Sequence, residues 1–267
     1  MQYVVIIIGV LLAWWAATRL LGARWASIGW GALAFPLSQL LRFALVIPLQ
    51  IAFTNWFDRP TALLAIAVLM VVTSGLFEET TRWIVLRFWA KKVRPWREGV
   101  GFGLGHGGIE AILLFTSTLS TNMMLLRNGD MVKAQVAQSG DPAAVEALET
   151  QIDMLNNLTF GLISLGWYER VLAICAHVAF TLIVLRAVRE RRWQLWLLAV
   201  VAHIVFNAVA VITMDNGVVW TYGFLTAFTA VALWAVVAGP LSRRVVDAHG
   251  SAELRAEEAR AAAGVRF

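Results

Sequence analysis

Two adjacent glutamates and an arginine stand near the end of a long apolar segment. The stretch FEETTRW, residues 77–83, closes a run of apolar residues that begins at Thr61, and it contains Glu78, Glu79 and Arg82. Ionisable side chains are costly in a membrane helix, and they usually face a cavity and carry function. A carboxylate there can act as the general base that takes a proton from water. The stretch is therefore a candidate for hydrolytic chemistry, or for an ion pair that pins helices together.

Further imidazole, carboxylate and amide groups interrupt the later apolar segments. His106 and Glu110 are four residues apart, as are His203 and Asn207, so each pair shares one face of a helix. A neutral imidazole or an amide can donate to a developing oxyanion. The same groups, with His106, His177 and His203 as candidate ligands, could hold Zn²⁺ and one water. No HExxH motif occurs in the sequence.

These groups lie at similar distances from basic residues that mark one side of a membrane: Glu78 is nine residues before Arg87, His106 nine after Arg97, His177 nine before Arg186, and His203 eleven after Arg192. At 1.5 Å per helical residue, each separation is roughly 13–17 Å. Four segments therefore place an acid or an imidazole at about one depth. We expect these side chains to meet in one water-accessible pocket.

The segments that must position these groups are apolar helices. The chain has 267 residues, of which 60% are hydrophobic and 15% charged, whereas about 25% is typical of a soluble domain. Apolar runs near the length of a membrane span recur along the sequence. The composition predicts an all-α, polytopic membrane protein with about seven spans, near 3–21, 28–53, 61–88, 100–126, 162–185, 195–214 and 219–238.

The basic residues predict the orientation of these spans. Sixteen Lys and Arg side chains fall in alternate turns and in the C-terminal tail, against three on the opposite side. Because such residues concentrate on the cytoplasmic side, we expect the N-terminus outside and the C-terminus inside. The charge bias favours contact with anionic lipid head groups and not with nucleic acid. Residues 1–241 are then a transmembrane domain, with a catalytic core near 61–214, and residues 242–267 are a cytoplasmic tail.

Two further features concern local structure. Residues 127–157 are polar, which predicts a loop with a short helix in DPAAVEALETQIDML. The stretch GLGHGGIEA contains Gly103, Gly105, Gly107 and Gly108. Small residues let a helix or substrate backbone approach closely, and glycine at this density could also unwind the helix locally.

Four motifs in order resemble one protein family. EETTR at 78–82, GHGGIEA at 105–111, ERVLAICAH at 169–177 and HIVFN at 203–207 resemble the YhfC family of intramembrane proteases. That family is grouped with PrsW and the type II CAAX prenyl endopeptidases. The resemblance covers about half of the chain and implies a membrane-embedded peptidase.

The resemblance also implies roles for individual residues. Glu78 corresponds to the base that activates water, with Glu79 and Arg82 in support. His203 and Asn207 match the motif that stabilises the oxyanion, and His177 matches the intervening histidine. The resemblance gives Glu110 the place of a later glutamate, whereas His106 stands where PrsW-like proteins have an aromatic residue. Ala173 replaces the phenylalanine that CAAX proteases have four residues before their histidine, which argues against prenyl-protein specificity.

We therefore expect an intramembrane endopeptidase that cleaves membrane-associated or lipidated substrates in the plasma membrane of a bacterium. A glutamic-type mechanism is favoured, because Asn207 stands where a last metal ligand is expected and adjacent acids can act alone, while a Zn²⁺ enzyme is the alternative. Two other classes stay open: a non-catalytic scaffold related to the multi-pass subunit of γ-secretase, and a proton-coupled transporter. We expect Arg42 to pair with a glutamate of the third span, and Glu169 to pair with Arg170.

Overall fold

The computed structural model describes residues 2–138, 140–213 and 217–248, with side chains from residue 5 onward. Helices make up almost all of these ranges, and no strand occurs within them. In chain order the helices are α1 (Gln2–Leu20), α2 (Trp25–Trp56), α3 (Arg59–Ile84), the π-helix η1 (Val85–Trp89), α4 (Trp96–Ala137), α5 (Pro142–Asn156), α6 (Phe160–Arg189), α7 (Trp193–Thr213) and α8 (Val218–Val237).

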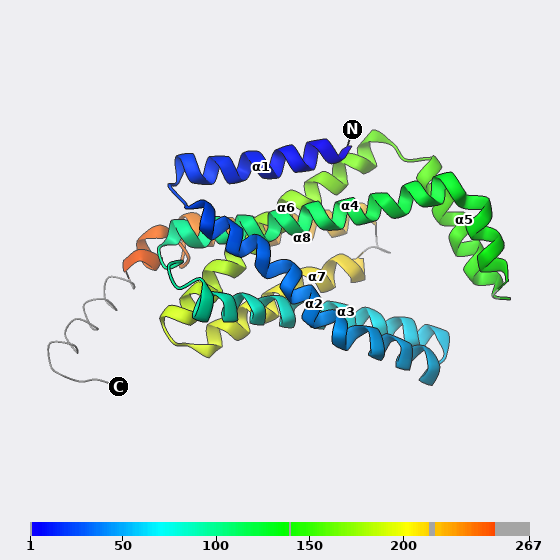
Figure 1. Ribbon diagram of the computed structural model, residues 1–267, viewed down its shortest axis with the longest axis horizontal. Coiled ribbons are helices and arrows are strands. Elements are labelled where there is room, and N and C mark those ends of the chain that lie inside the picture. The colour runs from blue at the N-terminus through cyan, green and yellow to red at the C-terminus, as the bar shows by residue number, and fades with distance from the viewer. Residues whose placement is uncertain (1, 139, 214–216, 249–267) are drawn as a thin grey trace.

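Six helical segments are long and apolar enough to cross a membrane. They correspond to α2, to α3 with η1, and to α4, α6, α7 and α8, while α1 adds a shorter apolar stretch, Val5–Leu20. The all-α membrane architecture is thereby confirmed. Figure 1 shows the turns before α2, α4 and α7 at one end of an elongated bundle, as the alternating basic turns require. The predicted end of a span at Met214 and the tail beyond residue 248 lie outside the described residues.

The segment after the fourth predicted span differs from the prediction. α4 continues through the expected loop to Ala137, and α5 follows after a short turn, so most of residues 127–157 are helical. Asn128 has non-helical dihedral angles, φ −124° and ψ 23°, which kink α4 without ending it. The loop prediction was wrong because polarity was taken as a sign of irregular structure. Only the short helix within it is confirmed.

The helices that carry the polar groups surround α4. α4 packs against α2 on one side and α6 on the other, and α3 packs against α2 and α7. α1 lies along α4 at the margin of the bundle, and α5 folds back on the far end of α4 (Figure 1). The polar segments of α3, α4, α6 and α7 therefore face a common centre.

Glycines of α2 and α4 permit this packing. A Cβ added to Gly31 of α2 would lie 1.9 Å from the carbonyl oxygen of Phe102, and one added to Gly105 would lie 2.0 Å from that of Ile28. On the α6 side, a Cβ at Gly103 would lie 2.6 Å from the Cα atom of Val178. The close-approach prediction is confirmed. The local unwinding that the glycines would allow does not occur, because the stretch is continuous helix held between two neighbouring helices.

Candidate functional site

Glu78 lies at the centre of a buried polar network. Its Oε2 atom is 3.2 Å from Nε2 of His106 and 3.9 Å from Nε2 of His203. Its Oε1 atom accepts hydrogen bonds from the Gln39 amide at 3.2 Å and from the Ser74 hydroxyl at 3.3 Å. Its side chain is almost wholly buried. Four helices therefore converge on this one carboxylate.

Glu79 has a different environment from its neighbour. Both of its carboxylate oxygens lie 2.6 Å from Nη1 of Arg82, three residues later on α3, and both side chains are fully buried. Its Oε1 atom also lies 2.8 Å from Nδ1 of His203. Because Arg82 keeps this carboxylate paired, Glu79 is an acceptor held in place, whereas no Lys or Arg among the described residues lies at ion-pair distance from Glu78.

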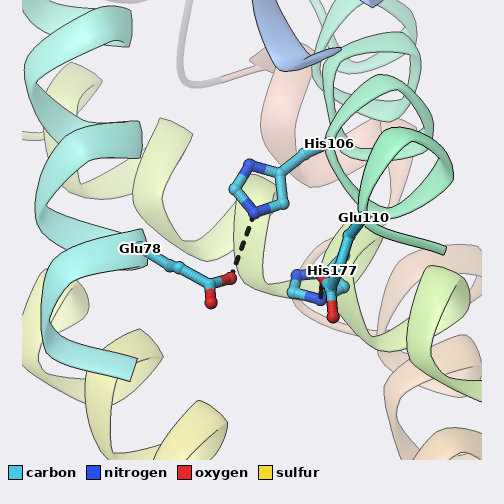
Figure 2. Close-up of side chains that lie close together, drawn as sticks. All are labelled: Glu78, His106, Glu110 and His177. Carbon is cyan, nitrogen blue, oxygen red and sulfur yellow. Dashed lines mark hydrogen bonds and ion pairs between the residues drawn. The ribbon is translucent and has the colours of Figure 1, made fainter. Parts of the chain in front are cut away.

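His106 reaches Glu78 because of the glycines beside it. Gly105 touches the α2 backbone and Gly107 faces His177 on α6, so the helices on both sides come close and His106 points between them. Phe35 of α2 packs edge-on to the His106 ring, with centroids 5.5 Å apart. Figure 2 shows His106 facing Glu78 across the gap between α4 and α3. The GHGG sequence is therefore a positioning device for His106.

His177 and Glu110 form a second pair in the same centre (Figure 2). Nε2 of His177 is 2.5 Å from Oε2 of Glu110. Nδ1 of His177 lies 3.1 Å from Nη2 of Arg82, which can only donate, so Nδ1 accepts. The hydrogen-bond network thus assigns the ring proton to Nε2, facing Glu110. Arg170 contacts Glu169, as expected, and also lies 4.0 Å from Glu110.

His203 is held in one orientation from two sides. The carboxylate of Glu79 accepts a hydrogen bond from Nδ1 of His203, so the ring proton is on Nδ1. Nε2 then carries no proton and faces Glu78. Phe180 of α6 stacks on the ring with centroids 5.0 Å apart and an interplanar angle of 14°. Metal-binding and catalytic histidines commonly donate one ring N–H to a carboxylate, which fixes the ring and leaves the other nitrogen available.

A cavity of about 240 Å³ gives access to Glu78. Its lining residues come from α2, α3, α4, α6 and α7. Its polar lining consists of Gln39, Arg42, Ser74, Glu78, Glu110, Arg170 and Asn207. This volume is below the usual range for drug-sized ligand pockets. The cavity can therefore take water and a short part of a substrate.

Arg42 is buried beside this cavity, but its partners differ from the prediction. Its guanidinium donates to Thr73 Oγ1 at 3.1 Å, to Gln39 Oε1 at 3.0 Å and to the carbonyl oxygen of Met70 at 2.7 Å. Within the described part of the chain, no carboxylate lies at ion-pair distance from Arg42. The expected direct pairing with a glutamate of α3 is wrong, because Gln39 lies between Arg42 and Glu78.

The structure thus brings the predicted site residues together, directly or through one intermediate. The direct network contains Glu78, Glu79, Arg82, His106, Glu110, His177 and His203. Asn207 joins through Ser74, whose hydroxyl accepts from its amide at 2.8 Å, and Arg42 joins through Gln39. Asn207 lines the cavity, whereas His203 does not.

Sequence reasoning missed Gln39, Ser74 and Phe180. Ser74 could have been found, since it lies four residues before Glu78 on the same helix face. Gln39 precedes Arg42 by three residues and shares its face of α2 in the same way. Phe180 carries no such signal, because an apolar residue in an apolar helix gives no reason to place it against one histidine.

The network contains donors of the kinds that bind zinc. Ligand atoms of Glu78, His106, Glu110 and His177 lie within 4.8 Å of one another, as do those of Glu79, His177 and His203. The hydrogen bonds distinguish among the histidines. His203 presents a free Nε2, and Nδ1 of His106 is buried without a hydrogen-bond partner, which leaves its tautomer free to change. His177 belongs to both groups, with Arg82 beside its Nδ1 and Glu110 beside its Nε2.

Comparisons with known proteins bear on this arrangement. A family profile described as YhfC intramembrane metalloprotease matches residues 4–229. The uncharacterized membrane protein YhfC of Bacillus subtilis (strain 168) is 33% identical over 151 residues, which cover 52% of this chain and 54% of the relative. The match thus spans about half the length of that curated relative. The search of solved structures found no significant match.

The profile covers far more of the chain than the four motifs do, and it confirms the family that those motifs indicated. A polar network buried among membrane-length helices agrees with that description. The protein is an integral membrane protein, and it belongs to the YhfC family of intramembrane metalloproteases.

Proposed function

We propose that this protein hydrolyses a peptide bond of a membrane-associated or lipidated substrate at the cavity beside Glu78. The proposal rests on the surroundings of the Glu78 carboxylate. Glu78 is buried, lines a cavity, and is held by neutral donors from α2 and α3 and by imidazoles from α4 and α7. A fixed carboxylate open to a small polar cavity is the arrangement that general-base activation of water requires.

The chain's own groups can carry out each step of the reaction. Glu78 accepts a proton from a water molecule, whose oxygen attacks the carbonyl carbon of the substrate. Asn207, on the cavity wall, donates an amide hydrogen to the oxyanion that develops. When the C–N bond breaks, protonated Glu78 returns the proton to the leaving amine. The products are a carboxylic acid and an amine, which exchange a proton to become a carboxylate and an ammonium group, so atoms and charges balance.

The remaining polar residues position this machinery. Arg82 fixes Glu79, Glu79 orients His203, and His203 and His106 together limit the rotation of Glu78. Gln39 and Ser74 fix the other carboxylate oxygen, so that Oε2 is the atom that faces the histidines. Preorganised polar groups of this kind need no rearrangement at the moment of reaction.

The family description implies a metal ion, and the donors present suit one. Either Glu78, His106, Glu110 and His177 or Glu79, His177 and His203 would hold it, because the donor atoms of each group lie within 4.8 Å of one another. A bound zinc ion would polarise the substrate carbonyl and make water a stronger nucleophile at neutral pH. Metal analysis of active protein would distinguish a glutamic-type enzyme from a metallo-type one.

A proton-coupled transporter and a non-catalytic scaffold could use the same side chains, but the geometry favours neither. A proton-coupled transporter is expected to use discontinuous helices at its binding site, whereas α3, α4, α6 and α7 are continuous where they meet. A non-catalytic scaffold has no need for a cavity that reaches a carboxylate. The hydrolase is therefore the function we propose, and the plasma membrane of a bacterium is the compartment that fits it.

The test compares cleavage in the membranes of living cells, so it requires no prior choice of substrate. Cells that express the wild type, Glu78→Gln or Glu146→Gln at equal levels are analysed by mass spectrometry of new protein N-termini in the membrane fraction. Glu146 lies on the exposed face of α5, so its variant is a charge-matched control. We expect a set of N-termini with the wild type and the control that is absent with Glu78→Gln. Identical N-termini in all three would rule the proposal out.

A further inference from the structure

A second cavity, of about 600 Å³, lies beside the basic turn between α6 and α7. Its wall is formed by the end of α3, by η1, by the end of α6 and by the start of α7. Most of the lining is apolar, and it includes the aromatic side chains of Trp83, Phe88, Trp193 and Trp196. Two arginines, Arg87 and Arg191, also line it. None of them belongs to the Glu78 network.

One of the two arginines is placed by an irregular piece of helix. In η1 the backbone N–H of Ala90 donates to the carbonyl of Val85 at 2.7 Å, five residues earlier. This π-helical turn carries both Arg87 and Phe88 onto the cavity wall. Such turns are rare, and they occur frequently at functional sites.

The second arginine occupies a position that suits glycine. Arg191 follows the end of α6 and has a φ of 53°, in the left-handed region. The backbone N–H of Arg192 donates to the carbonyl of Ala187 at 3.1 Å, which closes the helix end in the usual way with Arg191 at the left-handed position. A residue with a Cβ atom is strained there, so glycine would be the easier choice. An arginine at this position indicates that its side chain is needed.

Neither arginine has an acidic partner among the described residues. The neighbouring Arg186 and Arg192 both contact Glu190, so acids are present nearby but do not reach the cavity. Two positive charges above an apolar, tryptophan-lined hollow fit a ligand with an anionic head and a hydrocarbon chain. Tryptophan and basic residues gather where a helix bundle meets lipid head groups, and anionic lipids are attracted there.

We propose that this cavity binds one anionic phospholipid. Its phosphate lies between Arg87 and Arg191, and one acyl chain packs against Trp83 and Trp196. Thr80, which follows Glu79 on α3, also lines the cavity, so the lipid supports the outer side of the helix that carries the candidate site. The proposal does not depend on the catalytic assignment.

The experiment uses the full chain in phosphatidylcholine vesicles that contain a minor fraction of brominated lipid, which quenches nearby tryptophan fluorescence. Brominated phosphatidylglycerol is compared with brominated phosphatidylcholine in the wild type, in Arg191→Gly, in Arg87→Gln with Arg191→Gly, and in Lys91→Gln with Arg192→Gln. The last variant removes two charges from the same end but none from the cavity lining. Lipid that stays bound is counted by native mass spectrometry.

We expect phosphatidylglycerol to quench the wild type and the control more strongly than phosphatidylcholine does. Retention of phosphatidylglycerol should fall about fivefold when one arginine is removed and about 30-fold when both are removed. Arg191→Gly alone should leave the thermal midpoint unchanged or raised, because glycine suits the left-handed position, so its loss of lipid cannot be ascribed to misfolding. Equal quenching by both lipids in the wild type, or equal retention in the wild type and the double variant, would overturn the proposal.

Discussion

Replacing Arg82 tests how the buried charges of the network depend on one another. Arg82 is fully buried, its Nη1 atom lies 2.6 Å from both oxygens of Glu79, and its Nη2 atom donates to His177 at 3.1 Å. Arg82→Met keeps the length of the side chain but leaves the Glu79 carboxylate without its cation. Removing one partner of a buried ion pair costs about 3–5 kcal/mol, and we expect a loss of that size.

A double-mutant cycle makes the expectation specific. In Glu79→Gln the amide oxygen can still accept from Nδ1 of His203, so that contact survives while the charge is lost. Combining Glu79→Gln with Arg82→Met removes both charges and leaves neither group uncompensated. We expect the double variant to be more stable than Arg82→Met alone, with a coupling of about 3 kcal/mol.

The assay is equilibrium unfolding of the four proteins in lipid bicelles, followed by tryptophan fluorescence and by far-UV circular dichroism. Agreement of the two probes checks that one cooperative transition is measured. If the losses of the single variants add to that of the double variant within about 0.5 kcal/mol, the two side chains do not form the buried pair described here.

Three further outcomes follow from the structure. Gly31→Ala forces a Cβ atom into the α4 backbone and should destabilise the protein by about 1–3 kcal/mol in the same unfolding assay. Gly29 has open space around it, so Gly29→Ala should be neutral or stabilising. Similar effects of the two substitutions would refute the close packing of α2 on α4. Asn207→Ala should lower kcat about 10²–10³-fold with little change in KM, if its amide serves the oxyanion, and an effect on KM alone would contradict that role. In active protein analysed for metal content, His177→Ala should lower the zinc-to-protein ratio, because His177 belongs to both donor groups; an unchanged ratio would contradict a zinc site there, and metal-free protein with full activity would establish the glutamic type.

The sequence predicted the helices and the meeting of the polar groups because both follow from simple periodicities. Apolar runs of membrane length imply spans, and a count of residues from the basic turns gave Glu78, His106 and His203 a common depth, which the contacts among them now match. Depth alone does not assign partners. Glu110 shares a helix face with His106 yet contacts His177, because the twist of α6 against α4 decides which side chains touch.

Other features depend on tertiary packing and could not be predicted in this way. The roles of Gly31 and Gly105 as contact points require knowing that α2 crosses α4 there. The partners of Arg42 depend on Gln39 lying between it and Glu78. The π-helical turn at Val85 has no recognised signature in the local sequence, so the cavity beside it was also not predicted.

The most direct measurement of the central claim is the origin of the oxygen in the product. The purified protein is incubated in H₂¹⁸O with a peptide that spans a cleavage site found in the comparison of N-termini, and the fragments are analysed by mass spectrometry for the wild type and for Glu78→Gln. We expect one ¹⁸O atom in the new carboxylate with the wild type, and no fragment with Glu78→Gln in a protein that keeps its helical content and thermal midpoint. Labelled product formed at the wild-type rate by Glu78→Gln would contradict the account, because water would then be activated by another group.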